Sequence, residues 1–372
     1  MEFRDLKKQY QVLREEMDRA VLDAMASGAY IMGPKVRELE QQLAEYVGVK
    51  HCLTCANGTD ALTLALKAWG IGPGDAVFVP DFTFFSSAEV VPLEGAEPVF
   101  VDVCEETFNI DAVDLEHAVK EVLAEGRLRP RVVVAVDLFG LPADYKAIRA
   151  VADRYGLLIL EDGAQGFGGT IDGKRACSFG DIATTSFFPA KPVGCYGDGG
   201  AVFTDNDEWA ALIGSYRVHG KGTFKYDNVR IGMNSRLDTV QAAVLQVKLK
   251  AFVDFELDAV NEAAAKYMGL LQGLATPVIP EGFRSSWAQY TLRLASSVQR
   301  DVLQAALKAE GIPSMVYYPK PMHLQTAFAG LPARPCTVAT SLCDRVLSLP
   351  MHPYLADEQI ETVSTVVLKA LQ

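Results

Sequence analysis

One lysine of the chain lies in a segment whose composition suits chemistry better than an exposed surface. Lys191 stands between Pro189 and Pro192, downstream of the hydroxyl residue Ser186 and upstream of a glycine-rich run that leads into the apolar residues 201–203. The prolines restrict the backbone on both sides of the lysine. A solvated lysine needs no such framing. The segment therefore indicates an amine held in a fixed position, with an ordinary surface turn as the alternative.

Two further groups of polar residues follow strand-like runs. Asp162 comes directly after the apolar residues 156–161, and Thr59 and Asp60 follow Gly58 at the start of an apolar helical pattern. A strand, a glycine turn and a helix N-terminus together make an anion-binding geometry, because free backbone N–H groups and the helix dipole point to one place. Capping of the helix by Thr59 or Asp60 is the alternative.

Strand-like and helical patterns alternate through the first two thirds of the chain. Continuous apolar strands separated by helices predict an α/β fold with a mostly parallel sheet covered on both faces. Ligands of such sheets bind beyond the carboxyl ends of the strands, where Asp162 lies. We expect strands over residues 51–55, 76–80, 98–103, 131–139 and 156–161, and helices over 36–47, 114–125, 145–155 and from an N-cap at Asp238, with Gln241 three residues on, to about Gly273.

The remainder of the chain mixes strand segments with one helical pattern over residues 301–310, which predicts a smaller α+β domain. A chain of 372 residues exceeds the usual size of a single core. We therefore expect a large domain with an N-terminal arm over 1–250 and a smaller domain over 251–372.

Composition excludes several classes of protein. Hydrophobic residues make up 49% of the chain and charged residues 22%, which excludes broad disorder. The formal charge of −12 with no basic cluster argues against nucleic acid or an anionic membrane as a partner. The charged amino terminus does not resemble a signal peptide, so we expect a cytoplasmic protein. Seven scattered cysteines indicate reduced thiols, and neither they nor the five histidines show metal-ligand spacing, so no metal is expected.

A lysine, a carboxylate at a strand end, hydroxyls near a helix N-terminus and the aromatic run P-D-F-T-F-F form a coherent set. Pyridoxal 5'-phosphate requires this set: a lysine for its Schiff base, a carboxylate for its pyridinium nitrogen, a phosphate cradle and a flat surface for its ring. A nicotinamide cofactor is disfavoured, because Gly166 and Gly168 begin a G-x-G pattern but Ile171 occupies the third glycine position of the dinucleotide fingerprint.

Several motifs spread over nearly the whole chain carry a resemblance to a known family. The runs N-G-T-D-A-L, D-F-T-F, E-D-G-A-Q, S-F-F-P-A-K-P-V-G-C-Y-G-D-G-G-A, R-V-H-G, G-M-N-S-R-L-D-T-V-Q-A-A and L-P-M-H-P-Y together resemble the DegT/DnrJ/EryC1/StrS family of sugar aminotransferases. The resemblance implies a fold type I, aspartate aminotransferase-like transferase that works as a homodimer with shared active sites. It also implies transfer of the amino group of L-glutamate to a nucleotide-linked keto sugar. Within the family, the chain is most similar to enzymes that aminate the 3-keto group of a UDP-2-acetamido-2-deoxy-hexuluronate for surface polysaccharides.

The resemblance also implies roles for individual residues. Lys191 would form the internal aldimine and then shuttle the proton between the substrate carbon and the cofactor. Asp162 would pair with the pyridinium nitrogen, Gln165 would face the phenolic oxygen, and Phe84 would stack on the ring. The phosphate would be held by Gly58, Thr59, the N–H of Asp60, Ser186 and Asn234 of a neighbouring subunit.

Three further residues would contact the sugar. Arg236 matches an arginine that faces the sugar carboxylate in the uronate-type enzymes, a group suited to a bidentate guanidinium. A structural salt bridge of Arg236 with Asp238 or a neighbour is the alternative. Tyr317 and Tyr318 stand where those enzymes carry a His-Tyr pair, so the histidine is replaced by Tyr317.

Other functions on the same scaffold remain open at this point. An aminotransferase of a neutral dTDP-, GDP- or UDP-keto-deoxysugar is the first alternative, and a regulatory protein that binds the cofactor without catalysis is the second. A dehydratase is disfavoured, because the family's dehydratases carry a histidine in place of the lysine at position 191.

Overall fold

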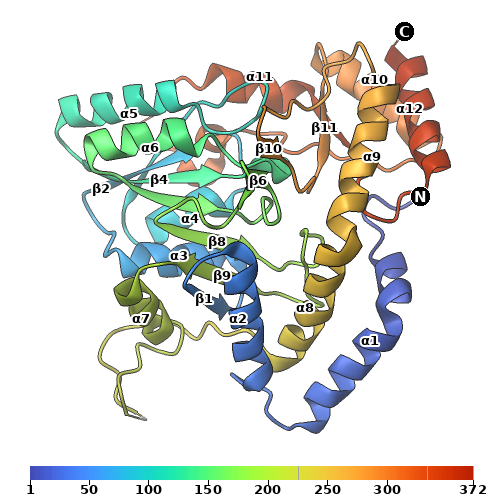
Figure 1. The fold of residues 1–372 in the computed structure, drawn as a ribbon. Helices are drawn as coiled ribbons and strands as arrows, with labels where there is room; N and C mark the ends of the chain where they lie inside the picture. The colour runs from blue at the N-terminus through green and yellow to red at the C-terminus, as the bar shows by residue number, and fades with distance from the viewer. Residues whose placement is uncertain (225, 333, 372) are drawn as a thin grey trace.

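The computed structural model describes residues 1–224, 226–332 and 334–371, and its centre is a seven-stranded sheet of these residues (Figure 1). The strand order is β1-β9-β8-β5-β4-β2-β3, and only β9 runs antiparallel to its two neighbours. The mostly parallel sheet predicted from the sequence is therefore confirmed. The strands are β1 (His51–Cys55), β2 (Asp75–Pro80), β3 (Glu97–Val101), β4 (Arg129–Val136), β5 (Leu158–Asp162), β8 (Ile182–Ser186) and β9 (Gly200–Thr204).

Helices cover both faces of this sheet (Figure 1). Helices α5 (Ala112–Glu125) and α6 (Tyr145–Tyr155) lie on one face, where Phe78 and Ile159 are fully buried. Helices α3 (Gly58–Ala68) and α4 (Ser86–Leu93) lie on the other face, over Val77 and Leu160. Alternate residues of each strand thus feed two separate cores, as expected of a sheet buried on both sides.

The strand expected over 131–139 ends earlier than predicted. Strand β4 stops at Val136, and Leu138–Gly140 form a short 3₁₀ turn in which Phe139 has a φ of 58°. The N–H of Phe139 donates to Gln165 Oε1 at 2.9 Å. A tertiary hydrogen bond therefore turns this apolar run away from the sheet.

The amino-terminal helix α1 (Leu6–Ala26) was not predicted from the sequence. It begins at Asp5, whose side chain accepts a hydrogen bond from the N–H of Lys8, and it packs along helix α8 (Thr239–Ala251). Figure 1 shows α1 beside α8, away from the other helices. Only Gln9, Met17 and Ala24 of α1 are buried, which explains why its apolar pattern is weak.

The long helical region expected after Asp238 is present. Helix α8 continues through the π-helical turn Phe252–Glu256 into α9 (Leu257–Leu270). The predicted domain boundary between residues 250 and 251 falls inside this continuous helix, and the division into two domains stays a prediction.

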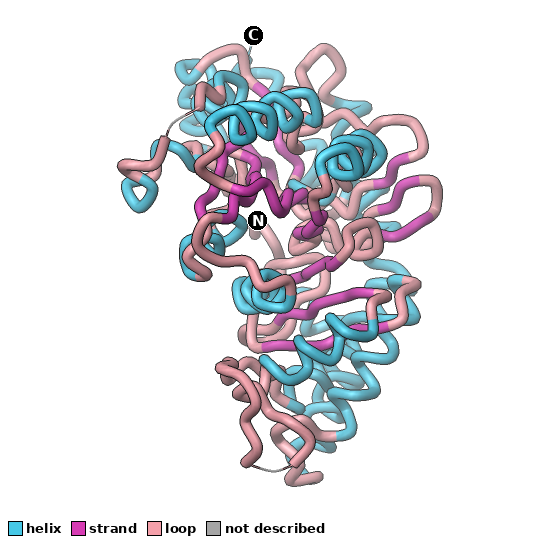
Figure 2. Tube along the Cα trace, turned by 90° about the vertical axis from the view of Figure 1, so that its left-hand side faces the viewer, coloured by secondary structure: helices cyan, strands magenta, loops and turns pink. Residues whose placement is uncertain are grey.

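In the described residues after α9, a two-stranded sheet packs with the helices α10, α11 and α12 (Figure 1), and Figure 2 shows helices and strands of the same chain from the side. Strand β11 pairs antiparallel with β12 beside the helices, while the short strands β6, β7 and β10 form a separate small sheet. No helix of the described residues is long and apolar enough to span a lipid bilayer. The remaining elements are α2 (Pro34–Val47), β6 (Thr170–Ile171), β7 (Lys174–Arg175), α7 (Asp207–Tyr216), β10 (Phe283–Arg284), β11 (Tyr290–Arg293), α10 (Ser297–Ala309), α11 (Thr337–Arg345), β12 (Val346–Leu349) and α12 (Asp357–Leu371).

Candidate active site

Lys191 lies in the loop that joins β8 to β9. The loop folds back on itself, and the N–H of Lys191 donates to the carbonyl oxygen of Phe188 at 2.8 Å. A side chain at Gly194 would place its Cβ 2.4 Å from the carbonyl oxygen of Pro189, so only glycine fits there. The turn that frames the lysine is therefore fixed by close backbone contacts.

Helix α8 is hydrogen-bonded to the same loop at Tyr196. Gln241 accepts a hydrogen bond from the N–H of Tyr196 at 2.8 Å and donates to its carbonyl oxygen at 3.2 Å. The sequence suggested a capping box between Asp238 and Gln241. Asp238 does occupy the N-cap position, but its side chain makes no capping hydrogen bond, and the Gln241 side chain binds the loop and not the N-cap.

Lys191 and Asp162 influence each other electrostatically at the carboxyl ends of β8 and β5. Burial lowers the pKa of the Lys191 amine and the nearby Arg4 charge lowers it further, whereas Asp162 acts in the opposite direction. Burial raises the pKa of the Asp162 carboxyl, against the hydrogen bonds that it accepts and the charge of Lys191. Among the described residues, no side chain forms a hydrogen bond or ion pair with the Lys191 ammonium. The structure thus combines an amine whose pKa is lowered with a buried carboxylate that interacts with it.

Ser87 supports Asp162 and was missed from the sequence. Its Oγ donates to Asp162 Oδ2 at 2.7 Å, while the N–H of Ala164 donates to Oδ1 at 3.2 Å. Thr83 Oγ1 lies 3.2 Å from the same serine hydroxyl. The serine lies just beyond Phe84, in the first turn of α4, so the D-F-T-F motif pointed to the right segment without singling it out.

Replacing Ser87 by alanine should destabilise the ionised form of the Asp162 carboxyl, because the carboxylate loses a hydrogen-bond donor. The loss of one hydrogen bond to a charged group costs about 1.5–3 kcal/mol, so we expect kcat/KM to fall roughly 10-fold. Because the pKa of Asp162 would rise further, the acidic limb of the pH–rate profile should move to higher pH. A matched Ser87→Thr variant keeps a hydroxyl and should retain most of the activity. An unchanged acidic limb in the alanine variant would rule out this role.

The turn between β1 and α3 forms a cradle with Ser186. Asn57 caps α3 by accepting a hydrogen bond from the N–H of Asp60 at 2.8 Å, so that N–H already has an acceptor. The capping role considered for Thr59 or Asp60 belongs to Asn57. A Cβ on Gly58 would lie 2.7 Å from Ser186 Cβ, so glycine brings the helix N-terminus against the serine.

The chemistry of this cradle fits a phosphate group. The first N–H groups of a helix lack intrahelical partners, and Gly58, the first residue of α3, lies against Ser186. Thr59 Oγ1 lies 2.9 Å from Ser86 Oγ, and the Ser86 hydroxyl itself donates to Glu89 Oε1 at 3.1 Å. A neutral cradle of N–H and O–H donors suits an anion even though the protein is acidic.

The rings of Phe84 and Tyr318 form an aromatic wall near Asp162, and Gln165 is hydrogen-bonded to it. Gln165 donates through Nε2 to the Tyr318 hydroxyl at 3.0 Å, and burial raises the pKa of that phenol. The rings of Phe84 and Tyr318 lie 6.3 Å apart. Phe84 is 51% exposed although it is a large apolar side chain, so one of its sides is available to a planar ligand.

The remaining predicted residues lie at the edge of this region. Asn234 is exposed, and the adjacent buried Ser235 accepts a hydrogen bond from the N–H of Ala56 at 3.1 Å, close to the cradle. Arg236 is half-buried and forms no ion pair with Asp238 within the described parts of the chain. The structural salt bridge considered for Arg236 is therefore not seen.

Two buried acids that lie near Asp162, namely Asp137 and Glu161, were not predicted from the sequence. Burial and mutual repulsion raise the pKa of Asp137, and burial raises the pKa of Glu161 despite three backbone N–H donors. The Asp137 Oδ1 atom accepts from the Tyr145 hydroxyl at 2.8 Å, but its Oδ2 is buried without a partner in the described structure. Both carboxyls therefore stay protonated to a higher pH than exposed acids do.

An Asp137→Asn variant should gain stability relative to the parent as the pH rises. Because both folded-state pKa values are raised, the folded parent holds protons that the unfolded chain releases above about pH 4, and its stability falls with rising pH. An asparagine removes the like charge, so we expect an advantage of about 1–3 kcal/mol near pH 8 that shrinks near pH 5. Urea unfolding at both pH values measures it. The exposed Asp153→Asn variant is the control, and a pH-independent difference would contradict the assignment.

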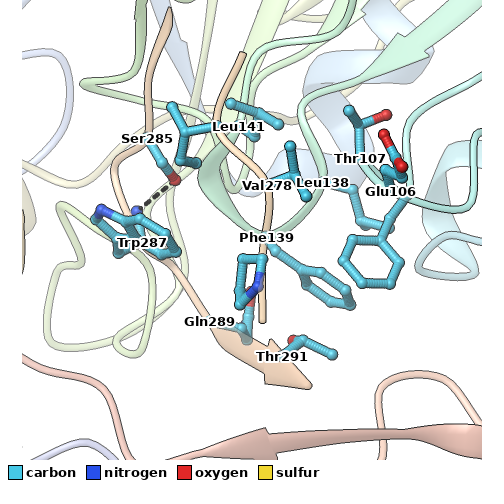
Figure 3. A pocket seen from close by; sticks show the side chains of 13 residues that line it. Glu106, Thr107, Leu138, Phe139, Leu141, Val278, Ser285, Trp287, Gln289 and Thr291 are labelled. Atoms are coloured by element: carbon cyan, nitrogen blue, oxygen red, sulfur yellow. Dashed lines mark hydrogen bonds between the residues drawn. The ribbon is translucent and has the colours of Figure 1, made fainter. Parts of the chain in front are cut away.

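Two other features do not take part in this site. Asp81, His323 and Cys336 bring their ligand atoms within 4.8 Å of one another, but His323 Nδ1 and its backbone N–H already bond the two oxygens of Asp81 at 2.6 and 2.7 Å. Figure 3 shows a small cavity between Phe139 and Trp287. Its volume of about 20 Å³ admits a single water molecule, and it is lined by none of the predicted site residues.

The sequence profile of the DegT/DnrJ/EryC1/StrS aminotransferase family matches residues 11–368. The chain belongs to this family. The aminotransferase activity and the fold expected from the sequence motifs are thereby confirmed.

Individual relatives agree with this assignment. The chain is 44% identical over 98% of both chains to the UDP-2-acetamido-2-deoxy-3-oxo-D-glucuronate aminotransferase of Pseudomonas aeruginosa. It is 40% identical to the UDP-N-acetyl-3-dehydro-alpha-D-glucosamine 3-aminotransferase of Acidithiobacillus ferrooxidans, over 99% of this chain and 97% of that enzyme.

Solved structures show the same fold. A family aminotransferase from Brucella abortus superposes with a TM-score of 0.97 at 49% identity, over 99% of both chains. NtdA from Bacillus subtilis, with the cofactor PMP bound, superposes with a TM-score of 0.87 at 27% identity, over 96% of this chain and 82% of that one.

Proposed function

We propose that this family member transfers the amino group of L-glutamate to the 3-keto group of a UDP-linked 2-acetamido sugar, with a uronate as the preferred substrate. The observation that carries the proposal is the half-buried Lys191, whose amine interacts electrostatically with the buried Asp162 carboxylate at the carboxyl end of β5. Both relatives named above act on the 3-keto position of UDP-linked sugars, which supports the substrate class.

The residues present fit pyridoxal 5'-phosphate as the cofactor. The cradle of Gly58, Thr59 and Ser186 supplies neutral phosphate donors, and the exposed side of Phe84 supplies a surface for the ring. The PMP bound in NtdA, which is the aminated form of this cofactor, gives the same support from a structural neighbour. When bound, the cofactor supplies an electron sink for negative charge at the carbon next to nitrogen.

Lys191 and Asp162 carry the chemistry in this proposal. Lys191 Nζ would hold the cofactor covalently and, once released, would carry the proton between the substrate carbon and the cofactor. Its lowered pKa favours the neutral amine that both tasks need. Asp162 would pair with the protonated ring nitrogen through its carboxylate, to which Ser87 donates a hydrogen bond that favours the ionised form. Gln165 orients the wall next to the ring through Tyr318.

A homodimer is part of the proposal, because the long loop between α7 and α8 projects from the body of the protomer (Figure 1). Phe224, Val229 and Ile231 on this loop are 74%, 55% and 92% exposed, which is unusual for apolar side chains that remain in water. Asn234 at the end of this loop would reach the phosphate cradle of the partner subunit.

Arg236 is proposed to bind the sugar carboxylate, and its replacement separates the uronate from the neutral alternative. With L-glutamate as donor, we expect the parent to prefer the UDP-linked 3-keto uronate over the neutral 3-keto sugar. An Arg236→Gln variant should lose about 30-fold or more in kcat/KM for the uronate alone, because one partner of a charged pair is gone. The control is Arg37→Gln, an exposed arginine of α2. Equal losses on both sugars would exclude carboxylate recognition by Arg236, and turnover of neutral dTDP-sugars alone would overturn the uronate assignment.

A further inference from the structure

The first residues of the chain reach the loop that carries Lys191. Arg4 Nη2 donates a hydrogen bond to the main-chain carbonyl oxygen of Lys191 at 2.9 Å, across 187 positions of sequence. The carbonyl of Phe3 accepts from the N–H of Met351 at 3.3 Å, and the Phe3 ring meets Tyr317 edge-on at 6.2 Å. The amino-terminal segment is therefore docked between the lysine loop and the carboxyl-terminal part of the chain.

A buried polar cluster holds Arg4 from the other side. Burial lowers the pKa of the Arg4 guanidinium, while Glu256 and Tyr354 favour its charge. Glu256 is only 3% exposed and accepts hydrogen bonds from Gln9 Nε2, at 2.8 Å, and from the Tyr354 hydroxyl. Helix α1, the π-helical turn and the segment before α12 thus all contribute to the place where Arg4 lies.

A second buried cation faces the same cluster. Lys248 is 1% exposed, its Nζ lies 4.4 Å from the centre of the Tyr196 ring, and it has no hydrogen-bond partner in the described structure. Burial lowers its pKa to about 8, so its charge is weakened, whereas the guanidinium of Arg4 stays charged. Of these two cations beside the lysine loop, Arg4 therefore keeps its positive charge to the higher pH.

We propose that Arg4 is a positioning residue for Lys191, which fixes the main chain at the lysine through a charge-assisted hydrogen bond and sets a positive charge beside the amine. Such a bond is shorter and stronger than one between neutral groups. A fixed carbonyl at Lys191 leaves the side chain, and not the loop, as the moving part when the amine leaves the cofactor. The inference rests on the proposed role of Lys191 as the reacting amine.

The charges around Lys191 agree with this geometry. Asp162 stabilises the ammonium form, and without an opposing charge it would offset part of the effect of burial. Arg4 acts against Asp162 and so helps to keep the pKa of the amine low. The same guanidinium therefore fixes the main chain of the loop at Lys191 and helps to keep the pKa of the amine low.

The test uses full-length protein with the cofactor removed, so that it does not depend on the sugar. Trace acetylation of Lys191 is followed against pH by mass spectrometry of its peptide, in the parent and in Arg4→Met, Arg4→Gln and Arg4→Lys. We expect Arg4→Met to label about 3- to 10-fold more slowly near pH 8, because more of the amine is protonated. Arg4→Gln should label as slowly, since it lacks the charge, and Arg4→Lys should label nearly as fast as the parent. Arg14→Met, an exposed arginine of α1, is the control.

Steady-state kinetics separate positioning from simple stability. In the reloaded enzymes we expect kcat of Arg4→Met to fall about 5- to 10-fold with little change in KM for the sugar, and the conservative lysine variant to recover most of it. If Arg4→Met does not fold, the comparison of Arg4→Lys with Arg4→Gln decides. Labelling and kcat equal to those of Arg14→Met would overturn the proposal. A shifted titration in a protein inactive on every keto sugar would instead refute the proposed substrate and leave the role of Arg4 standing.

Discussion

Replacing Lys191 by alanine is expected to abolish transamination, with kcat falling by about 10⁴-fold or more. In the proposed mechanism the variant would lose both the covalent link to the cofactor and the group that moves the proton, and Lys191 is the lysine whose charge acts on Asp162 among the described residues. The parent should show the visible absorption of a lysine-bound cofactor, and L-glutamate should bleach it. Borohydride should fix the cofactor to the peptide that contains Lys191.

The lysine variant should show none of these signals while it keeps its fold. The exposed Lys146→Ala variant on α6 is the matched control and should match the parent in spectrum, labelling and rate. Persistent borohydride labelling in Lys191→Ala would assign the covalent link to another lysine. A passive cofactor-binding protein would keep the visible absorption in the presence of L-glutamate, and that result would exclude catalysis.

The second large effect is expected at Asp162. Asp162→Asn keeps the size of the side chain but removes the charge that would pair with the protonated ring nitrogen, and we expect kcat to fall about 10²- to 10³-fold. KM for the nucleotide sugar should change little, because the side chain acts on the ring and not on the sugar. Stopped-flow half-reactions with L-glutamate measure the effect directly. Asp344→Asn, an exposed position of α11, is the control, and a parent-like half-reaction in Asp162→Asn would remove this carboxylate from the mechanism.

Local sequence patterns were sufficient to predict most strands of the central sheet and several of the helices that cover it. The expected segments 51–55 and 145–155 coincide with β1 and α6, because a buried strand and an amphipathic helix are encoded in neighbouring residues. Lys191, Asp162, Gly58 and Ser186 were identified by motif. In the structure Gly58 lies against Ser186, and the Asp162 carboxylate interacts electrostatically with the Lys191 amine. Their roles toward cofactor and sugar stay predictions.

What the sequence did not reveal depends on contacts between distant residues. The hydrogen bond of Ser87 to Asp162 joins residues 75 positions apart, and that of Arg4 to Lys191 spans the first and second halves of the chain. Strand β4 ends early because Gln165 binds the N–H of Phe139. Helix α1 escaped detection because one of its three buried residues, Gln9, is polar and is satisfied by Glu256.

The pairing of β1 with β9 has a consequence for how the chain folds and for its stability. A residue beside the phosphate cradle, Gly200, would place a Cβ 2.4 Å from the carbonyl oxygen of Asn57, so both sides of the cradle meet only after β9 has been synthesised. Closure over such a sequence distance is slow. A ligand that binds only the closed form, at a hundred times its Kd, adds about 2.7 kcal/mol to stability. Bound cofactor would thus contribute to the stability of the folded chain and not only to its activity.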